Sequence, residues 1–252
     1  MKILRLLALS VALVPFLATS ETFTLQTRDW CPFVCQNEKD HPGFVIEVLK
    51  NVLAKDGHNL ELEFVQTEDE NTLKERTKIN YLFGPMSKTD DTSLSYLPIE
   101  FANTKQCFYV LKDDEWEFYD FKNLTNRKIK YNNSNPQKLD FIVFQKYNST
   151  TLSHYRNHNE LSSIINELID KKIDTIFENP IVFNYYSVKE DLRDKFAEVG
   201  CINGDNYYLG YRPKKKDSKN SEKLFLKRIQ ELKDSETIDK IIKKYHLKDW
   251  RP

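Results

Sequence analysis

The chain has 252 residues, of which 40% are hydrophobic and 30% are charged, and its 38 basic residues balance its 38 acidic residues. This composition is typical of a globular protein with one large domain or two lobes, and it excludes a mainly disordered chain. Because the chain has no basic excess, we expect no nucleic-acid partner.

The N-terminal residues differ from the rest of the chain. Lys2 and Arg5 precede an apolar run over residues 6–17, and residues 18–20 are small. This order predicts a cleaved secretory signal peptide over residues 1–20, which is too short to span a membrane. No later stretch is apolar enough to span one. We therefore expect an exported protein.

The chain after residue 20 begins with a strand, a helix and a second strand. Residues 21–28 alternate apolar and polar side chains, which predicts a strand, and residues 60–65 repeat this alternation. Between them, apolar residues recur at helical spacing from Phe44 to Leu53, and Gly57 is placed to end the helix. Short connections between such elements require a parallel sheet.

A loop rich in aromatic residues joins the first strand to this helix. Trp30, Pro32 and Phe33 place flat apolar side chains in the loop, and Cys31 and Cys35 are spaced to close it with a disulfide. Such a loop is suited to form one wall of a small-ligand cleft. The alternative is an ordinary loop whose aromatic side chains fold into the core.

The remaining elements are predicted from shorter patterns. A helix is expected over residues 70–78, and a strand over residues 79–83 is expected to end at Gly84 and Pro85. A polar break at residues 112–115 marks a boundary, after which the pattern of strands and helices begins again. The other expected strands lie at residues 97–102, 106–111, 128–131, 140–144, 174–177 and 207–211, and the other helices at residues 160–170, 180–187, 222–233 and 235–245, the last with Ser235 as its N-cap.

The four cysteines predict two disulfides in an exported chain, and three pairings exist. Cys31 and Cys35 are close in sequence, whereas Cys107 and Cys201 each lie at one end of an apolar, strand-like run. We therefore favour the pairs Cys31–Cys35 and Cys107–Cys201. A zinc site is the alternative, but the spacing of these cysteines fits structural zinc poorly.

The chain has two successive sets of predicted strands and helices, and its last strand and helices return to the first set. This order predicts two lobes, the first of them discontinuous. The first lobe is expected over residues 21–110 and 203–252, and the second over residues 111–202. The strands that carry Cys107 and Cys201 would then cross between the lobes. A disulfide between them would fasten the hinge while leaving the lobes able to close.

Several short motifs occur in an order that covers nearly all of the chain after residue 20. They include Trp-Cys-Pro-Phe-Val-Cys at residues 30–35, Pro-Gly-Phe-Val-Ile-Glu-Val at residues 42–48, Phe-Gly-Pro-Met-Ser at residues 83–87 and Lys-Lys-Ile-Asp-Thr-Ile-Phe-Glu-Asn at residues 171–179. In this order and spacing, the chain resembles the bacterial extracellular solute-binding proteins of family 3.

The resemblance implies an α/β, two-lobed periplasmic-binding-protein-like (type II) fold, in which each lobe is a βα sheet domain and two crossover strands join the lobes. It implies a periplasmic monomer that captures a small polar molecule between the lobes and serves an inner-membrane ABC permease. One alternative is a signalling module that engages a membrane sensor through the same clamshell. Another is an enzyme on this fold.

The resemblance also indicates where the ligand would bind. In amino-acid-binding members, an arginine after the third strand holds the ligand carboxylate, and an acidic residue of the second lobe holds its ammonium group. Here Thr92 and Asn179 stand at these positions, so we do not expect an α-amino acid as the ligand. The expected ligand contacts are Trp30, Phe33, Tyr81, Phe83, Gly84, Met86, Lys88, Thr92, Glu178 and Asn179. Phe83 is equally suited to the core, Lys88 to the surface, and Glu178 with Asn179 to capping the next helix.

Motifs for catalysis or for a cofactor are missing from the sequence. It contains no nucleophile elbow, phosphate-binding glycine loop or HExxH motif, and only six glycines. His154 and His158 have a spacing that can bind a metal on a helix, but their polar surroundings favour a pair at the surface. We therefore expect no enzymatic activity, no cofactor and no metal.

Overall fold

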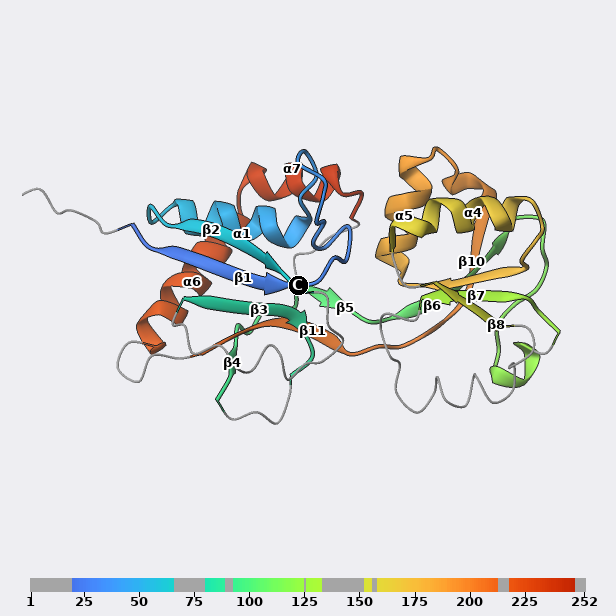
Figure 1. Ribbon diagram of the computed structural model, residues 1–252, viewed down its shortest axis with the longest axis horizontal. Helices are drawn as coiled ribbons and strands as arrows, with labels where there is room; N and C mark the ends of the chain where they lie inside the picture. The colour runs from blue at the N-terminus through green and yellow to red at the C-terminus, as the bar shows by residue number, and fades with distance from the viewer. Residues whose placement is uncertain are drawn as a thin grey trace, which may run out of the picture.

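A computed structural model shows two lobes, each with a sheet and covering helices, lying side by side (Figure 1). It describes residues 20–65, 80–88, 93–124, 126–132, 152–155, 158–212 and 218–247. Residues 1–19 of the expected signal peptide, the expected helix at 70–78, the expected strand at 140–144 and Thr92 lie outside these ranges. Within them, no helix has the length and apolar character needed to cross a membrane.

The first lobe is built on a mixed sheet with the strand order β2-β1-β3-β11-β4, and β5 also pairs with β11. Its strands are β1 (Thr22–Thr27), β2 (Asn59–Phe64), β3 (Tyr81–Met86), β4 (Ser95–Tyr96), β5 (Ala102–Asn103) and β11 (Asn206–Tyr211). β1 runs parallel to β2 and β3, whereas β11 is antiparallel to β3. With α1 (Phe44–Ala54) between β1 and β2, this confirms the predicted strand–helix–strand unit.

The third strand does not end where the sequence analysis placed its end. β3 continues through Gly84 and Pro85 to Met86. Opposite these residues, the register of β11 shifts between Tyr208 and Gly210. Such an irregularity lets a strand contain a proline, which has no N–H to donate to the ladder.

The second lobe is built on a sheet with the strand order β10-β6-β9-β7-β8. Its strands are β6 (Gln106–Leu111), β7 (Ile129–Asn132), β8 (Leu152–Tyr155), β9 (Thr175–Glu178) and β10 (Phe196–Ile202). β7 is parallel to β8 and β9, and β6 is antiparallel to β9 and β10. β8 was not predicted, because a short strand with polar residues in its middle lacks a clear alternating pattern.

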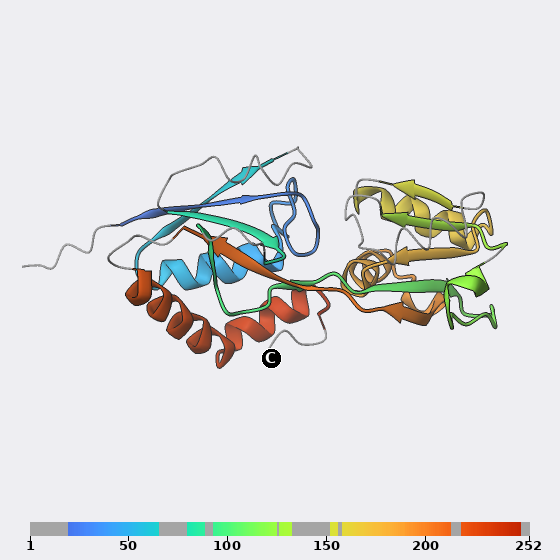
Figure 2. The same ribbon diagram turned by 90° about the horizontal axis from the view of Figure 1, so that it is seen from below.

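The helices cover the faces of the two sheets. In the first lobe, α1, α6 (Ser218–Lys233) and α7 (Glu236–Lys244) pack together on the same face of the sheet (Figure 2). In the second lobe, α4 (Leu161–Ile169) contacts α5 (Pro180–Lys189) and the sheet. The short 3₁₀ segments are η1 (Phe121–Leu124), η2 (His158–Glu160) and η3 (Arg193–Lys195). Ser235 precedes α7 as expected, but its hydroxyl donates a hydrogen bond to the Leu232 carbonyl instead of capping the helix.

Two short segments, residues 104–105 and residues 203–205, connect the sheets. They are joined to each other, because the Thr104 N–H donates to the Asp205 carbonyl at 2.9 Å. The first boundary therefore precedes β6, whereas the sequence analysis placed it after residue 110. β6 belongs to the second sheet because it pairs with β9 and β10.

Both favoured disulfides are confirmed. Cys31 is bonded to Cys35, and Cys107 is bonded to Cys201. Cys107 on β6 lies directly opposite Cys201 on β10, so the second disulfide ties the two strands that lead into the connecting segments.

Candidate functional site

The stapled loop, residues 29–43, forms the end of the first lobe that faces the second lobe (Figure 1). Trp30 and Val34 exchange backbone hydrogen bonds of 2.8 and 2.9 Å, and the Cys31–Cys35 disulfide closes the same turn. The carbonyls of Pro32 and Phe33 accept hydrogen bonds from the first N–H groups of α1. The loop is therefore held by its own backbone before any ligand is bound.

The C-terminal end of α7 also anchors this loop. The Gly43 N–H donates to the Tyr245 hydroxyl at 2.9 Å, and that hydroxyl donates to the Glu47 carboxylate at 2.6 Å. Burial, followed by the hydrogen bond to Glu47, raises the pKa of Tyr245 above its ordinary value, which favours the phenol as a hydrogen-bond donor. Lys244 pairs with the same carboxylate. Glu47 is therefore a structural carboxylate that joins α1 to α7.

The aromatic side chains of the loop pack against each other and against the first lobe. The rings of Trp30 and Phe33 lie 4.4 Å apart, and Trp30 also meets Tyr207 edge-on at 5.6 Å. Phe33 is only 1% exposed and packs against Phe44, so it mainly belongs to the core. Trp30 is half-buried and lies between the loop and β11.

The predicted contacts on β3 and just after it divide into core and surface residues. Tyr81 and Phe83 are buried in the first lobe, and the Tyr81 hydroxyl donates to Glu63 at 3.3 Å. Gly84 is also buried, whereas Met86 is half-buried. Lys88 is exposed, and its Nζ lies 4.1 Å from the centre of the Tyr208 ring, which is a cation–π contact.

Asn179 joins α5 to the first connecting segment. Its side-chain oxygen accepts hydrogen bonds from the N–H groups of Ile181 and Val182, which caps α5. Its side-chain nitrogen donates to the carbonyls of Asn103 and Lys105 at 2.6 and 3.1 Å. These contacts use both ends of the amide, which is 1% exposed. They agree with the capping alternative of the sequence analysis.

Glu178 is buried where three strands of the second lobe end. It accepts hydrogen bonds from Tyr155 at the end of β8, from Asn132 at the end of β7 and from the N–H of Asn179. Burial, followed by the charge of Glu178, raises the pKa of Tyr155 well above its ordinary value. The carboxylate is 1% exposed, so its described contacts are with the protein.

Side chains from α5 contact the stapled loop directly. Lys189 Nζ lies 3.0 Å from a carboxylate oxygen of Glu38, and the Tyr185 hydroxyl donates to the same carboxylate at 3.3 Å. Burial, followed by the charge of Glu38, raises the pKa of Tyr185. Nearby, the Asn159 amide donates to Asp29 at 3.4 Å. Polar contacts thus join the two lobes on this side.

A pocket of about 810 Å³ lies between the lobes. Both lobes and the first connecting segment line it, with aromatic side chains and charges of both signs. The lining residues are Phe33, Phe44, Glu100, Phe101, Ala102, Asn103, Lys105, Tyr109, Lys112, Pro180, Ile181, Phe183, Asn184, Ser187, Arg193, Asp194, Phe196, Glu198, His246 and Leu247.

Of the predicted ligand contacts, Phe33 lines this pocket, whereas the other described ones do not. Tyr109 and Phe183, whose stacked rings are 3.7 Å apart at the pocket wall, were not among the predicted contacts. Glu198, which accepts a hydrogen bond from the Tyr109 hydroxyl at 3.0 Å, was not among them either. Their positions on a predicted strand and helix were the available signal, but the pairing of β6 with β10 was needed to bring Tyr109 and Glu198 together.

The family model of the bacterial extracellular solute-binding proteins, family 3, matches residues 25–248. No curated protein sequence matches the chain. The fold is similar to an ancestral arginine-binding protein bound to arginine, with a TM-score of 0.61, 18% identity, and coverage of 89% of this chain and 97% of that one.

Two bacterial structures are similar to the same degree. An arginine 3rd transport system periplasmic binding protein from Legionella pneumophila has a TM-score of 0.60 and 17% identity, over 90% of this chain and 100% of that one. An ABC uptake transporter substrate-binding protein from Streptococcus pneumoniae with bound histidine has a TM-score of 0.62 and 18% identity, over 89% and 92%. At these identities the likeness shows the two-lobed fold alone.

Proposed function

We propose a binding function from the premise that this chain belongs to the bacterial extracellular solute-binding proteins, family 3. The protein captures a small polar molecule between its lobes and delivers it to an inner-membrane ABC permease, without transforming it. The observation that carries this proposal is the interlobe pocket of about 810 Å³, lined by both lobes and the connecting segment. Its volume lies within the roughly 300–1,000 Å³ typical of small-ligand sites.

The proposed ligand is not a standard α-amino acid, although similar structures contain arginine or histidine. Asn179, which stands where amino-acid-binding members carry an acid, uses its amide to cap α5 and to hold the connecting segment. Glu178 beside it is 1% exposed. Neither side chain is placed to meet a ligand ammonium group as an exposed carboxylate would be.

The proposed setting is the periplasm, reached through cleavage of the signal peptide, with the protein acting as a monomer. Mass spectrometry of the exported protein measures the site of cleavage, and light scattering measures the mass in solution. An uncleaved N-terminus would contradict the proposed export route, and a stable dimer would contradict the monomer.

Native mass spectrometry of the purified protein tests the binding function, because a captured solute adds its mass to that of the chain. A panel of polar metabolites then tests binding through the fluorescence of Trp30, whose ring lies 4.4 Å from that of Phe33 at the pocket wall. The Trp116→Phe/Trp250→Phe variant serves as the background, because it leaves Trp30 as its one tryptophan. We expect saturable quenching and no product. Tight binding of an α-amino acid would overturn the proposed specificity, and turnover of a bound metabolite would overturn the binding-only function.

The transport role needs a separate measurement. A cognate ABC permease, reconstituted in vesicles, should hydrolyse ATP faster when the loaded protein is added. Loss of this stimulation with a ligand-free protein supports delivery. Equal hydrolysis with and without the loaded protein would contradict it and favour the signalling alternative.

A further inference from the structure

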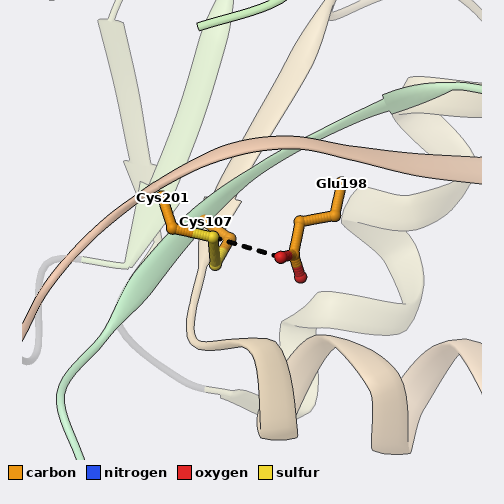
Figure 3. A group of neighbouring side chains, drawn as sticks. All are labelled: Cys107, Glu198 and Cys201. Carbon is orange, nitrogen blue, oxygen red and sulfur yellow. Dashed lines mark hydrogen bonds between the residues drawn. A yellow bond between two sulfur atoms is a disulfide. The ribbon is translucent and has the colours of Figure 1, made fainter. Parts of the chain in front are cut away.

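The second disulfide lies beside a carboxylate at the end of the second lobe that leads into the connecting segments. Cys107 on β6 and Cys201 on β10 are opposite each other, with Cα atoms 4.0 Å apart. Glu198 lies on β10 before an irregularity in the register, which brings its side chain to the same side (Figure 3). One carboxylate oxygen of Glu198 is 3.2 Å from Cys201 Sγ.

These side chains bring three potential metal ligands together. Within the described residues, the sulfurs of Cys107 and Cys201 and a carboxylate oxygen of Glu198 all lie within 4.8 Å of one another. A tetrahedral zinc ion with Zn–S bonds of about 2.3 Å separates its two sulfur ligands by roughly 3.8 Å. The oxygen is therefore already at a suitable range, and the bonded sulfurs need only rotate apart once they are free.

A neighbouring tyrosine holds the carboxylate in this orientation. The Tyr109 hydroxyl donates to Oε2 of Glu198 at 3.0 Å, which leaves Oε1 directed to the sulfur. The Tyr109 ring is itself fixed by stacking on Phe183 of α5. A hydrogen bond that orients a ligating carboxylate is a regular part of protein metal sites.

We propose that reduction of the Cys107–Cys201 disulfide creates a binding site for a thiophilic divalent cation such as Zn²⁺, with two thiolates and the Glu198 carboxylate as ligands. A dithiol supplies two electrons and two protons, so the disulfide becomes two thiols and the dithiol becomes its own disulfide. Metal binding then displaces both thiol protons. In the oxidised protein the sulfurs bind each other and the site does not form.

The surroundings give this site an open coordination position. Glu198 is exposed and lines the interlobe pocket, and Cys201 is half-buried. Water or a pocket ligand can therefore complete the tetrahedron from the pocket side. Cys107 is 0% exposed, so the site opens through Cys201 and Glu198, whereas both cysteines of the Cys31–Cys35 pair are buried, at 1% and 4% exposed.

The site would also preserve the mechanical role of the disulfide. A cation held by Cys107 and Cys201 links β6 to β10 as the covalent bond does, so these strands stay fastened in both redox states. The two thiolates neutralise the cation, so the net charge of the site is unchanged, and the reduced protein would differ in presenting a Lewis-acidic metal ion to the interlobe pocket. This inference concerns a site that does not depend on the proposed transport function.

Cobalt titration tests the proposal, because Co²⁺ bound to thiolates gives charge-transfer absorption that a carboxylate-only site does not. The protein is reduced, freed of reductant under anaerobic conditions and titrated with Co²⁺. The Cys31→Ser/Cys35→Ser variant retains only the Cys107–Cys201 pair, and Cys107→Ser/Cys201→Ser retains only the other pair. We expect one equivalent of Co²⁺ with thiolate bands in the first variant and in the wild type, and none in the second.

Substitutions around the cluster separate the carboxylate from the thiolates. Glu198→Gln should weaken Co²⁺ affinity at least tenfold, and Tyr109→Phe, which keeps the stacked ring, should weaken it by about 10–100-fold while retaining the bands. Thiolate bands in reduced Cys107→Ser/Cys201→Ser equal to those of the wild type would overturn the proposal. So would unchanged affinity in Glu198→Gln, and so would bands in the oxidised wild type. If the Cys31→Ser/Cys35→Ser variant fails to fold, the difference in thiolate bands between reduced wild type and reduced Cys107→Ser/Cys201→Ser still tests the proposal.

Discussion

Lys189 near the end of α5 lies 3.0 Å from Glu38 of the stapled loop, so an ion pair connects the second lobe to the first. The side chains are 47% and 29% exposed, which places the pair among partly solvated salt bridges. Such pairs contribute about 0.2–1 kcal/mol, and salt screens them.

A double-mutant cycle with Glu38→Gln and Lys189→Met should therefore give a coupling energy of about 0.5 kcal/mol at low salt, and less at high salt. Urea denaturation of the four proteins measures it. Lys172→Met, whose partner Asp170 lies in the same lobe and is exposed, serves as the control for loss of a surface charge. A coupling that stays the same at high salt would contradict the ion-pair explanation.

Asn179→Asp should destabilise the protein, although it places an acid where amino-acid-binding members carry one. The new carboxylate still caps α5, but an oxygen replaces the nitrogen that lies 2.6 Å from the Asn103 carbonyl. Two oxygen acceptors would then face each other in a buried position, at a cost of about 1–3 kcal/mol. Asn166→Asp on the outside of α4, with an exposed amide, should change the free energy of unfolding by less than about 0.5 kcal/mol. Equal losses in the two variants would contradict this role of Asn179.

The contacts of Asn179 also show which part of the site could be predicted from the sequence. The helix at residues 180–189 and the cap before it were predictable, because proline and a polar residue at a helix start follow local rules. The carbonyls of residues 103 and 105 were not, because every residue has a carbonyl and its position depends on how distant segments cross. The assignment of Asn179 to the ligand therefore rested on position in the chain alone.

The same distinction applies to the rest of the fold. The apolar stripe of α1 and the alternation in β1 and β2 predicted the first lobe, because each pattern reflects local burial. The pocket wall required non-local pairing. Tyr109 and Glu198 are 89 positions apart in the chain, and they meet because β6 and β10 are antiparallel neighbours.

Acid should weaken the contact between Asp56, after α1, and Arg228 on α6. The guanidinium holds both carboxylate oxygens, at 2.6 and 3.1 Å, and this hydrogen bonding lowers the pKa of Asp56 below its ordinary value of 3.8. Because the folded state binds the proton less tightly than the unfolded chain, the contribution to stability is complete well above pH 3.8 and is lost as the pH falls through and below it.

Urea denaturation from pH 7 to pH 3 checks this dependence. The stability difference between wild type and Asp56→Asn should be present at neutral pH and should shrink below about pH 4. Asp170→Asn serves as the control, because it removes an exposed carboxylate whose described partner is Lys172, two residues along the chain. Its stability difference from the wild type should show no comparable change with pH. A difference for Asp56→Asn that grows on acidification would have the wrong sign for a lowered pKa.

Gly43→Ala should be far more damaging than Gly57→Ala, although both glycines have positive φ, +115° and +74°. A Cβ on Gly43 would lie 2.5 Å from the Phe33 carbonyl oxygen, inside the stapled loop, whereas a Cβ on Gly57 would meet no atom within 4 Å. Gly57→Ala therefore carries only the backbone penalty of about 1–2 kcal/mol. Gly43→Ala adds a clash with backbone that cannot move without breaking the hydrogen bonds of the loop, so we expect a loss of at least about 3 kcal/mol. Urea denaturation compares the two variants. Similar losses in the free energy of unfolding would mean that the backbone of the stapled loop can move to accommodate the Cβ, which would contradict its rigidity.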